Sequence, residues 1–455
     1  MNIESIPAPG GRIEISPRSM GVKLIVVGAL ALAMLIPGIF VGGLVQERSE
    51  RAADVVRQIS DYAGGQQVFL GPTLLIPYRI PPQSSTDFTR YGSYLVFPAT
   101  ASAVVKTVTE ERHRSLFKVP VYRAEVGFDA SFDLTGIPSA APDRAEFDWS
   151  RTEIVVGVSN ARGALADATL TSAGKTATLA PAQAASDLRI GGDQNTAIGV
   201  TLLGGKIDAP IKPGARFSVT SSLRFSGAQR IGFLSYGKAT RLTAQGDWPN
   251  PSFDGGFLPV RRTVTGNGFS ADWSIPFIAR GLRGDGPIEW FAALSATELG
   301  TSFVEVADPY QSVNRARKYV LLFVGLLFLS YFVFEVTTGK RVHPAQYFLV
   351  GLAQIIFYLL LLSLAERVGF DWAFALAGAA TVALLSVNAA WVFSSRLHGV
   401  RALAIFSLLY SSIYMMLRLE DNALLVGAIA SFFAIAATMY FTRKIDWYGA
   451  ASERA

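Results

Sequence analysis

Few side chains in this sequence could carry catalytic chemistry. The 455 residues include no cysteine and three histidines, His113, His343 and His398. A chain without cysteine has no disulfides, thiolate metal sites or cysteine nucleophiles. No two histidines have metal-ligand spacing, and His113, which a Ser–His–Asp triad would need, sits in the charged run 110–114, typical of a solvated turn. We therefore expect no metal, no cofactor and no enzyme activity.

Three further patterns resemble catalytic or nucleotide-binding motifs and do not satisfy them. Gly174-Lys175-Thr176 resembles the end of a phosphate loop, but Thr169 occupies the upstream glycine position and the segment reads as a hairpin tip. The glycines of 266–271 precede strand-like sequence, whereas a dinucleotide fingerprint precedes a helix. Asp129 and Asp133 share one strand face about 13 Å apart, too far for a glycosidase pair. Carboxylates that meet across strands stay open as an alternative.

The polar residues within apolar segments are also few. Gln354 and Asn388 fall in mid-segment, and Glu335 lies near the end of its segment. Pumps and ion-coupled transporters usually keep charged residues near mid-depth in the membrane, and none lies there in this sequence. Glu335 could pair with Lys340 or Arg341, or reach the interface. We interpret it as structural first, with a functional role as the alternative.

The element that must position these residues is a C-terminal block of five apolar runs. At 1.5 Å per residue, about 16–22 uncharged residues span a bilayer core of about 30 Å. A buried core helix of a soluble protein would explain one such run but not five in succession. We predict a five-helix transmembrane bundle over residues 319–442, from the runs Tyr319–Phe334, Tyr347–Leu364, Trp372–Phe393, Ala402–Leu417 and Ala423–Phe441.

A sixth apolar run lies near the N-terminus. We read residues 1–20 as a disordered cytoplasmic tail and 21–45 as a transmembrane anchor, because Leu24–Val45 carries no charge. A signal peptide is the rival interpretation, but its apolar region is about 7–15 residues and ends at a small-residue cleavage site. Gly38 and Gly42 form a G-x-x-x-G pair that allows close helix packing.

The central residues 46–315 alternate with period two. A polar helix over Gln46–Tyr62 ends at Gly64-Gly65, and from Tyr122 to Leu134 apolar and polar residues alternate without a break. Ala168–Leu179 reads as a hairpin that turns near Ala173-Gly174. The predicted fold class is therefore a membrane α-helical bundle of six transmembrane helices, one plus five, with a large antiparallel β-sandwich-type extracytoplasmic domain.

Lysine and arginine counts predict the orientation. With the N-terminus inside, the inner segments carry ten of these residues and the two short outer loops carry only Arg367 and Arg418. Arg315, Arg317 and Lys318 oppose this assignment, but long domains translocate largely regardless of charge. We therefore expect cytoplasmic termini, a cytoplasmic tail over 443–455 and a periplasmic β-rich domain.

Two strings supply candidate functional residues. Trp248–Pro259 combines three prolines, a glycine pair and aromatic side chains, and we expect Trp248 to pack and Phe253 to lie exposed at a turn tip. The second string joins Phe332–Glu335 to Arg341–Tyr347, where Pro344 suits the first turn of a helix. The candidates are Trp248, Phe253, Phe257, Glu335, His343 and Gln346.

Seven strings in order along nearly the whole chain carry a family resemblance: Gly71-Pro72 with Ile76-Pro77, Asn160–Gly163, Trp248–Pro259, Arg315–Tyr319, Phe332–Glu335, His343–Gly351 and Thr442–Tyr448. Together they resemble the CreD family of bacterial inner-membrane proteins. The resemblance implies a cell-envelope integrity protein of the inner membrane, tied to envelope stress and a two-component regulatory system, with no known reaction.

We therefore predict a non-enzymatic inner-membrane protein whose β-rich domain binds an envelope component. Its partners are the lipid bilayer and an envelope protein, lipid or glycan, with no nucleic acid. The alternative is a transporter or flippase-like accessory for a lipid or glycan. A third hypothesis is a tethered periplasmic carbohydrate-active enzyme. The ligand and the oligomeric state do not follow from the sequence.

Overall fold

The computed structural model describes residues 20–84, 86–114, 117–185, 187–191, 198–207, 211–303, 313, 320–418 and 423–443. The chain divides into two compact units, a helical unit of Met1–Arg51 with Ala307–Ala455 and a β-rich unit of Ala52–Val306. Apart from Met20 and Arg443, the predicted tails lie outside the described residues, as do Arg315, Arg317 and Lys318.

The first described element is a long helix in two parts, α1 (Met20–Ala33) and α2 (Leu35–Tyr62). The break falls just before Pro37, whose missing N–H removes one intrahelical hydrogen bond. Gly64 and Gly65 end the helix with φ angles of 99° and 71°, which glycine adopts without steric cost. The predicted helix over Gln46–Tyr62 and its glycine stop are therefore confirmed.

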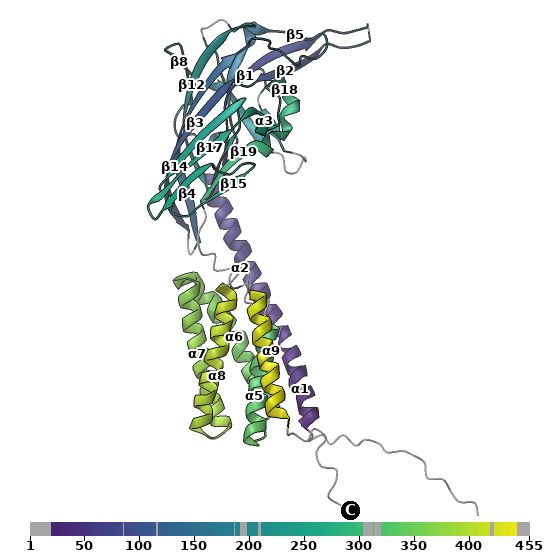
Figure 1. Cartoon of the computed structure of the whole chain (residues 1–455), viewed down its shortest axis with the longest axis vertical. Helices are drawn as coiled ribbons and strands as arrows, with labels where there is room; N and C mark the ends of the chain where they lie inside the picture. Colours follow the sequence, from purple (N-terminus) through teal and green to yellow (C-terminus); the bar gives the residue numbers. More distant parts are fainter. Residues whose placement is uncertain are drawn as a thin grey trace, which may run out of the picture. The chain divides into compact units, whose positions relative to one another are not determined.

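The C-terminal bundle contains five helices, one for each predicted apolar run (Figure 1). Within the described residues, four stretches are long and apolar enough to cross a membrane: Gly21–Tyr62 and the helices α6, α7 and α8. The apolar stretches of α5 and α9 within the described residues, Leu322–Thr338 and Gly427–Thr442, are shorter than these four. The helices are α5 (Val320–Thr338), α6 (Pro344–Val368), α7 (Phe370–Val392), α8 (Arg396–Arg418) and α9 (Ala423–Thr442).

Aromatic rings fill the middle of this bundle. Tyr331 of α5 stacks on Phe406 of α8 with ring centroids 5.7 Å apart, and Phe357 of α6 meets Tyr410 of α8 edge-to-face at 5.0 Å. All four side chains are at most 3% exposed. Van der Waals packing of this kind holds transmembrane helices together where lipid removes the usual hydrophobic driving force.

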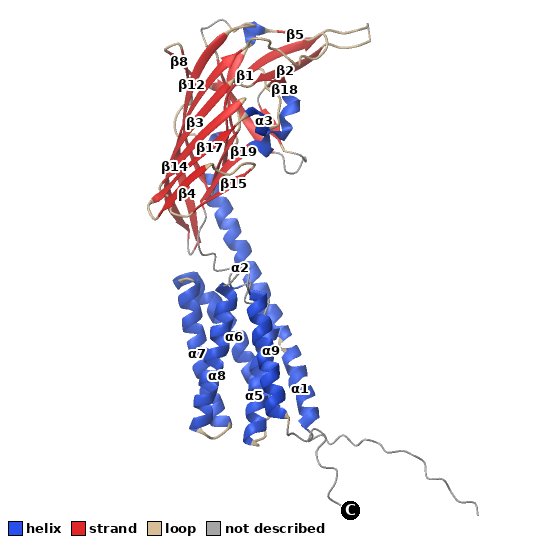
Figure 2. Cartoon of the chain, viewed as in Figure 1, coloured by secondary structure: helices blue, strands red, loops and turns tan. Residues whose placement is uncertain are grey.

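The β-rich unit contains two sheets (Figure 2). In its described part, the larger sheet has eleven strands, of which seven follow the order β10-β11-β6-β1-β13-β19-β15, and β2, β5, β9 and β18 pair beside this path. Their bounds are β1 (Gln67–Ile80), β2 (Arg90–Val96), β5 (Glu146–Phe147), β6 (Glu153–Val158), β9 (Ala180–Pro181), β10 (Asp187–Ile190), β11 (Ile198–Gly205), β13 (Arg230–Leu234), β15 (Pro251–Gly255), β18 (Asp285–Pro287) and β19 (Glu298–Phe303).

The second sheet has eight strands in the described residues, in the order β16-β17-β14-β3-β4-β12-β7-β8. Four short helical segments complete the described part of the unit, η1 (Trp149–Arg151), η2 (Ala161–Gly163), α3 (Phe277–Arg280) and η3 (Ile288–Thr297). The bounds are β3 (Thr100–Arg114), β4 (Phe117–Asp133), β7 (Thr169–Ser172), β8 (Lys175–Thr178), β12 (Arg216–Ala228), β14 (Ala239–Gly246), β16 (Arg261–Thr265) and β17 (Gly268–Ile275).

Most neighbouring strands run antiparallel, as predicted, but β1–β13 and β14–β3 are parallel pairs. The sheets are therefore mixed, which corrects the expectation of an antiparallel domain. Both parallel pairs join strands more than a hundred residues apart in the sequence, so no turn between them constrains their direction.

One apolar core serves both sheets. Along β4 the predicted alternation is confirmed, because Tyr122, Val126 and Phe128 are at most 1% exposed while the intervening residues are more exposed. Phe128 meets Phe233 of the larger sheet at 6.3 Å. The predicted hairpin is confirmed as β7–β8, with Ala173 and Gly174 at φ angles of 50° and 79°.

Candidate functional site

Glu335 lies in the last turn of α5 with only 1% of its surface exposed. Its carboxylate has three partners: the Lys23 ammonium group forms an ion pair with Oε1, the backbone N–H of Val342 donates to the same oxygen at 3.1 Å, and the Tyr347 hydroxyl donates to Oε2 at 3.0 Å. Both carboxylate oxygens are occupied, which is the condition under which a protein tolerates a buried charge.

Lys23 brings the first helix into this cluster. Its ammonium group also donates to the carbonyl oxygen of Val342 at 2.5 Å, and its side chain is 18% exposed. The ion pair joins residues 312 positions apart in the chain. It therefore ties α1 to α5 and to the link that leads into α6.

His343 and Gln346 lie where α6 begins. His343 caps the helix, since its Nδ1 accepts a hydrogen bond from the Ala345 N–H at 3.2 Å, and Pro344 occupies the first turn as predicted. Gln346 Oε1 accepts from Asn388 Nδ2 at 3.3 Å. The His343 contact explains a helix start, whereas the Gln346 contact joins α6 to α7.

Asn388 extends this connection to a third helix. Tyr331 of α5 donates from its hydroxyl to Asn388 Oδ1 and to the Leu385 carbonyl, both at 3.0 Å. The chain of contacts from Gln346 through Asn388 to Tyr331 joins α6, α7 and α5. Side-chain hydrogen bonds of this type add about 0.6 kcal/mol each to membrane helix association.

A separate polar group lies within the bundle. Tyr410 of α8 donates to Gln354 Oε1 of α6 at 2.6 Å, and both residues are at most 3% exposed. Gln354 Nε2 and the Tyr358 hydroxyl have no hydrogen-bond partner among the residues that the structure describes. This group contains no charge and joins α6 to α8.

The aromatic loop of the β-rich unit is packed rather than exposed. Trp248 is half-buried and meets Phe303 edge-to-face at 6.4 Å. Phe253 lies in β15, half-buried, with its ring 5.9 Å from Phe269 and 5.7 Å from Trp273. The expectation of Phe253 at an exposed turn tip is wrong, because β15 pairs with β19 and its alternation turns this ring inward.

Phe257, the third aromatic candidate of the loop, is also half-buried. Its carbonyl oxygen accepts a hydrogen bond from Trp273 Nε1 at 3.0 Å, and its side chain packs against the core. The loop candidates Trp248, Phe253 and Phe257 therefore share a packing role on the edge of one core.

A three-residue ion cluster supports the same edge. Arg230 lies between Asp254 and Glu298, with nitrogen–oxygen distances of 2.7 and 2.5 Å, and Ser302 donates to Asp254 at 2.6 Å. Burial raises the pKa of Asp254, but the hydrogen bonds from Arg230 and Ser302 outweigh burial and hold that pKa below its usual value. Asp254 is therefore a structural carboxylate of β15.

A further feature of the β-rich unit is a basic and aromatic pocket. A cavity of about 300 Å³ is lined by Gly281, Leu282, Arg283, Trp290 and Phe291. The Arg283 guanidinium lies 5.1 Å from the centre of the Trp290 ring, a cation–π distance. Trp290 is 49% exposed, so an aromatic face and a positive charge meet at the surface.

Arg280 lies next to this pocket in the sequence and is 3% exposed. Its guanidinium is 3.8 Å from the centre of the Phe97 ring, and its Nε and Nη2 have no hydrogen-bond partner among the described residues. Burial lowers the pKa of Arg280 to about 9. Phe277 and Ile278, just before it, expose 47% and 90% of their surface.

Residues 19–448 match the family model described as inner membrane protein CreD. The chain belongs to the CreD family. It is 29% identical over 434 residues to the inner membrane protein CreD of Escherichia coli K12. The aligned region covers 92% of this chain and 91% of that protein. The resemblance drawn from the motifs is thus confirmed, and this member of the CreD family is an inner-membrane protein.

Two of the motifs that resemble the CreD family occupy positions of close backbone approach. A Cβ atom on Gly71 would lie 2.5 Å from the Tyr236 ring, and one on Gly163 would lie 2.5 Å from the Gln67 amide. A third motif, His343–Gly351, builds the start of α6 and supplies Tyr347 to Glu335. The motif Arg315–Tyr319 and most of Thr442–Tyr448 lie outside the described residues.

Sequence reasoning missed the partners of Glu335 and the whole basic pocket. The sequence left two alternatives for Glu335, a pair with Lys340 or Arg341 or a place at the interface. The counter-ion is Lys23, and Lys340 donates to the Phe393 carbonyl at 2.8 Å. Lys23, a single cation at the start of an apolar run, was the available signal. Arg280 gave no signal of burial, because its contact with Phe97 joins residues far apart in the sequence.

Proposed function

We propose that this CreD-family protein supports cell-envelope integrity under stress without catalysing a reaction, by binding an envelope component through its β-rich unit. The proposal includes six membrane crossings, α1–α2 and α5 to α9, with cytoplasmic termini and a periplasmic, sandwich-type β-rich unit. The excess of lysine and arginine in the inner segments supports this orientation.

The observation that carries the proposal is the basic and aromatic pocket beside α3. Its volume of about 300 Å³ matches the small end of ligand sites, and exposed Trp and Arg side chains are typical of binding surfaces. Arg283 and the nearby Arg280 add positive charge, so the ligand we expect is an anionic headgroup or an acidic glycan of the envelope. Trp290 offers a flat apolar face for the ligand's less polar part.

The buried charges of the bundle support the non-transporting part of the proposal. Glu335 uses both oxygens on Lys23, Val342 and Tyr347. A carboxylate that couples ion movement to transport must exchange its partners, whereas this one is held by three donors. Its role is therefore to hold α1 and α6 against α5.

Cross-linking in living cells tests the binding proposal. A photoreactive phenylalanine analogue in place of Ile278, an exposed residue three positions before the pocket residue Gly281, should form an adduct whose mass identifies an envelope lipid or glycan. The same analogue at Phe88, which is 82% exposed in the β-rich unit, is the matched control. Adding Arg283→Ser should abolish the adduct at position 278 and leave labelling at position 88 unchanged, which supports the proposal. Equal labelling at both positions contradicts it.

Cysteine labelling tests the orientation, because the chain has no native cysteine. Ser131→Cys and Ser222→Cys should react with an impermeant thiol reagent in intact spheroplasts, and Gly339→Cys should react only after lysis. The reverse pattern would place the β-rich unit in the cytoplasm and end the proposal.

A further inference from the structure

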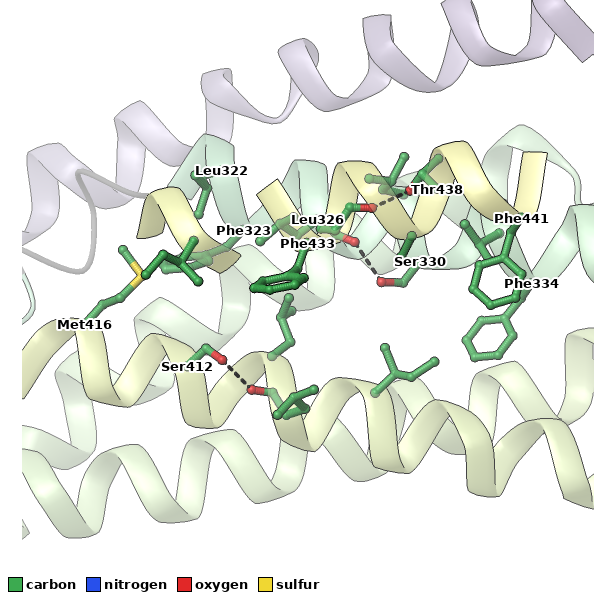
Figure 3. A pocket seen from close by; sticks show the side chains of 18 residues that line it. Leu322, Phe323, Leu326, Ser330, Phe334, Ser412, Met416, Phe433, Thr438 and Phe441 are labelled. Carbon is green, nitrogen blue, oxygen red and sulfur yellow. Dashed lines mark hydrogen bonds between the residues drawn. The ribbon is translucent and has the colours of Figure 1, made fainter. Parts of the chain in front are cut away.

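A lateral cavity of about 600 Å³ opens between α5, α8 and α9 (Figure 3). It extends from Leu322 and Met416 at one end to Phe334 and Phe441 at the other (Figure 3). On α9 the lining residues run from Ile429 to Phe441, about 18 Å along the helix axis. The cavity is therefore a groove that follows the helices.

The wall of this groove offers hydrocarbon and no free polar group. Its three hydroxyl side chains each donate to a carbonyl of their own helix: Ser330 to Leu326 at 2.8 Å, Ser412 to Leu408 at 2.9 Å and Thr438 to Ala434 at 2.8 Å. An apolar cavity of this kind stays dry and accepts apolar ligands.

The two ends of the groove differ in charge. Arg401 is exposed one helical turn before the lining residue Ile405, and therefore on the groove face of α8. The described residues include no carboxylate within ion-pair distance of Arg401. At the opposite end Arg418 forms an ion pair with Asp371. Of these two arginines, Arg401 at the Phe334–Phe441 end is therefore the one without a described carboxylate partner.

The length and the wall of the groove select its occupant, because the lining is apolar over about 18 Å along α9. An extended acyl chain is narrow and wholly apolar, so it fits both the volume and the wall. A phosphate at the head of that chain would complement Arg401.

We propose that the groove between α5, α8 and α9 binds one acyl chain of an anionic phospholipid, with the lipid phosphate held near Arg401. This site is distinct from the pocket of the β-rich unit. Its loss would leave ligand cross-linking at position 278 unchanged, so the two proposals fail separately.

Native mass spectrometry of the full-length protein in detergent tests the acyl-chain site. The wild type should retain one phospholipid per chain after delipidation that strips other lipids. Ala437→Trp fills the groove and should lose this lipid, whereas Ala436→Trp adds the same side chain about 100° around α9, at a residue that does not line the groove, and should keep it. Ala434→Leu provides a smaller filling change with partial loss should the larger substitution impair folding.

The headgroup contact is tested by titrating phosphatidylglycerol against phosphatidylcholine. Arg401→Gln should weaken phosphatidylglycerol binding about fivefold and leave phosphatidylcholine unchanged. Arg396→Gln is the matched control, since Arg396 lies nine residues before Ile405, on the opposite face of α8.

Three outcomes would overturn the inference. They are a delipidated wild type without bound phospholipid, equal lipid loss in Ala437→Trp and Ala436→Trp, and a dimer that Ala437→Trp dissociates, which would make a second copy the occupant. Equal effects of Arg401→Gln and Arg396→Gln would remove the headgroup assignment.

Discussion

The helical bundle and the β-rich unit use polar and apolar side chains in opposite ways. In the bundle, Lys23 and Glu335 are hidden in a closed ion pair while an apolar groove lies open at the side. In the β-rich unit, apolar side chains fill a common core while Arg283 and Trp290 line a surface pocket. In lipid an unpaired charge is costly, so the bundle pairs and buries its charged side chains. In water exposed hydrocarbon is costly, so the β-rich unit buries its apolar side chains.

The strongest test of this contrast is to break the buried ion pair. Glu335→Ala leaves the Lys23 charge without its carboxylate, so the bundle should lose about 3–5 kcal/mol of stability. Unfolding in sodium dodecyl sulfate, followed by helical circular dichroism, measures the loss. Because the cost arises from the unpaired charge, the double variant Lys23→Met, Glu335→Leu should recover most of it. A double variant as unstable as Glu335→Ala would contradict the structural interpretation of the pair.

The aromatic edge of the β-rich core should give the next largest effect. Trp248→Ala and Phe253→Ala each remove a half-buried ring, and each should cost about 2 kcal/mol, below the range for fully buried rings. Hydrogen exchange of β15 and β19 in the full-length protein measures both losses. Phe88→Ala, at a mostly exposed ring, is the control and should change little. A near-wild-type Phe253→Ala beside a destabilised Trp248→Ala would restore the exposed-tip hypothesis.

Acid should weaken the same edge through Asp254. The pKa of this carboxyl in the folded chain lies below its ordinary value of 3.8, so its ionised form stabilises the fold at higher pH. That stability is present above pH 3.8 and is lost as the pH falls through the folded-state pKa. Hydrogen exchange of β15 as a function of pH should show the loss in the wild type and a shallower dependence in Asp254→Asn.

The control for the pH experiment is Asp167→Asn, at an exposed aspartate of the same unit. This variant should keep the wild-type pH dependence of β15. A profile in Asp254→Asn that superimposes on the wild type would show that Arg230 and Ser302 do not lower the pKa of Asp254 enough to affect stability.

The smallest expected effect concerns the neutral contacts of the bundle. Asn388→Leu removes the hydrogen bonds to Gln346 and Tyr331 and should cost about 0.6 kcal/mol per bond. The measurement is the same detergent unfolding used for Glu335→Ala. A loss as large as that of Glu335→Ala would mean that neutral contacts, and not the ion pair, hold these helices.

Local patterns allowed the elements to be predicted, and distant contacts account for what was missed. The alternation from Tyr122 to Leu134 and the turn at Ala173-Gly174 depend on neighbours in the chain, and both are confirmed. The parallel pairing of β1 with β13 and the Lys23–Glu335 ion pair depend on residues far apart in the sequence. Hydrophobic periodicity and composition do not indicate which distant residues pair.

The error at Phe253 has the same origin. Ser252 and Asp254 flank it with polar groups typical of a turn, but both residues lie in β15, which pairs with β19. Asp254 contacts Arg230 and Ser302. A polar residue beside an aromatic one is equally typical of a strand edge and a turn tip. Only the pairing partner distinguishes them.

The central claim is that the pocket is the recognition surface and the buried ion pair is structural. The most direct test compares two double variants at equal membrane abundance in a strain that lacks the protein, with survival in detergent as the readout. Lys23→Met, Glu335→Leu should restore survival, because the helices remain joined without the charges. Arg283→Ser, Trp290→Ala should fail although the protein is folded. Rescue by the pocket variant and failure of the folded ion-pair variant would contradict the claim.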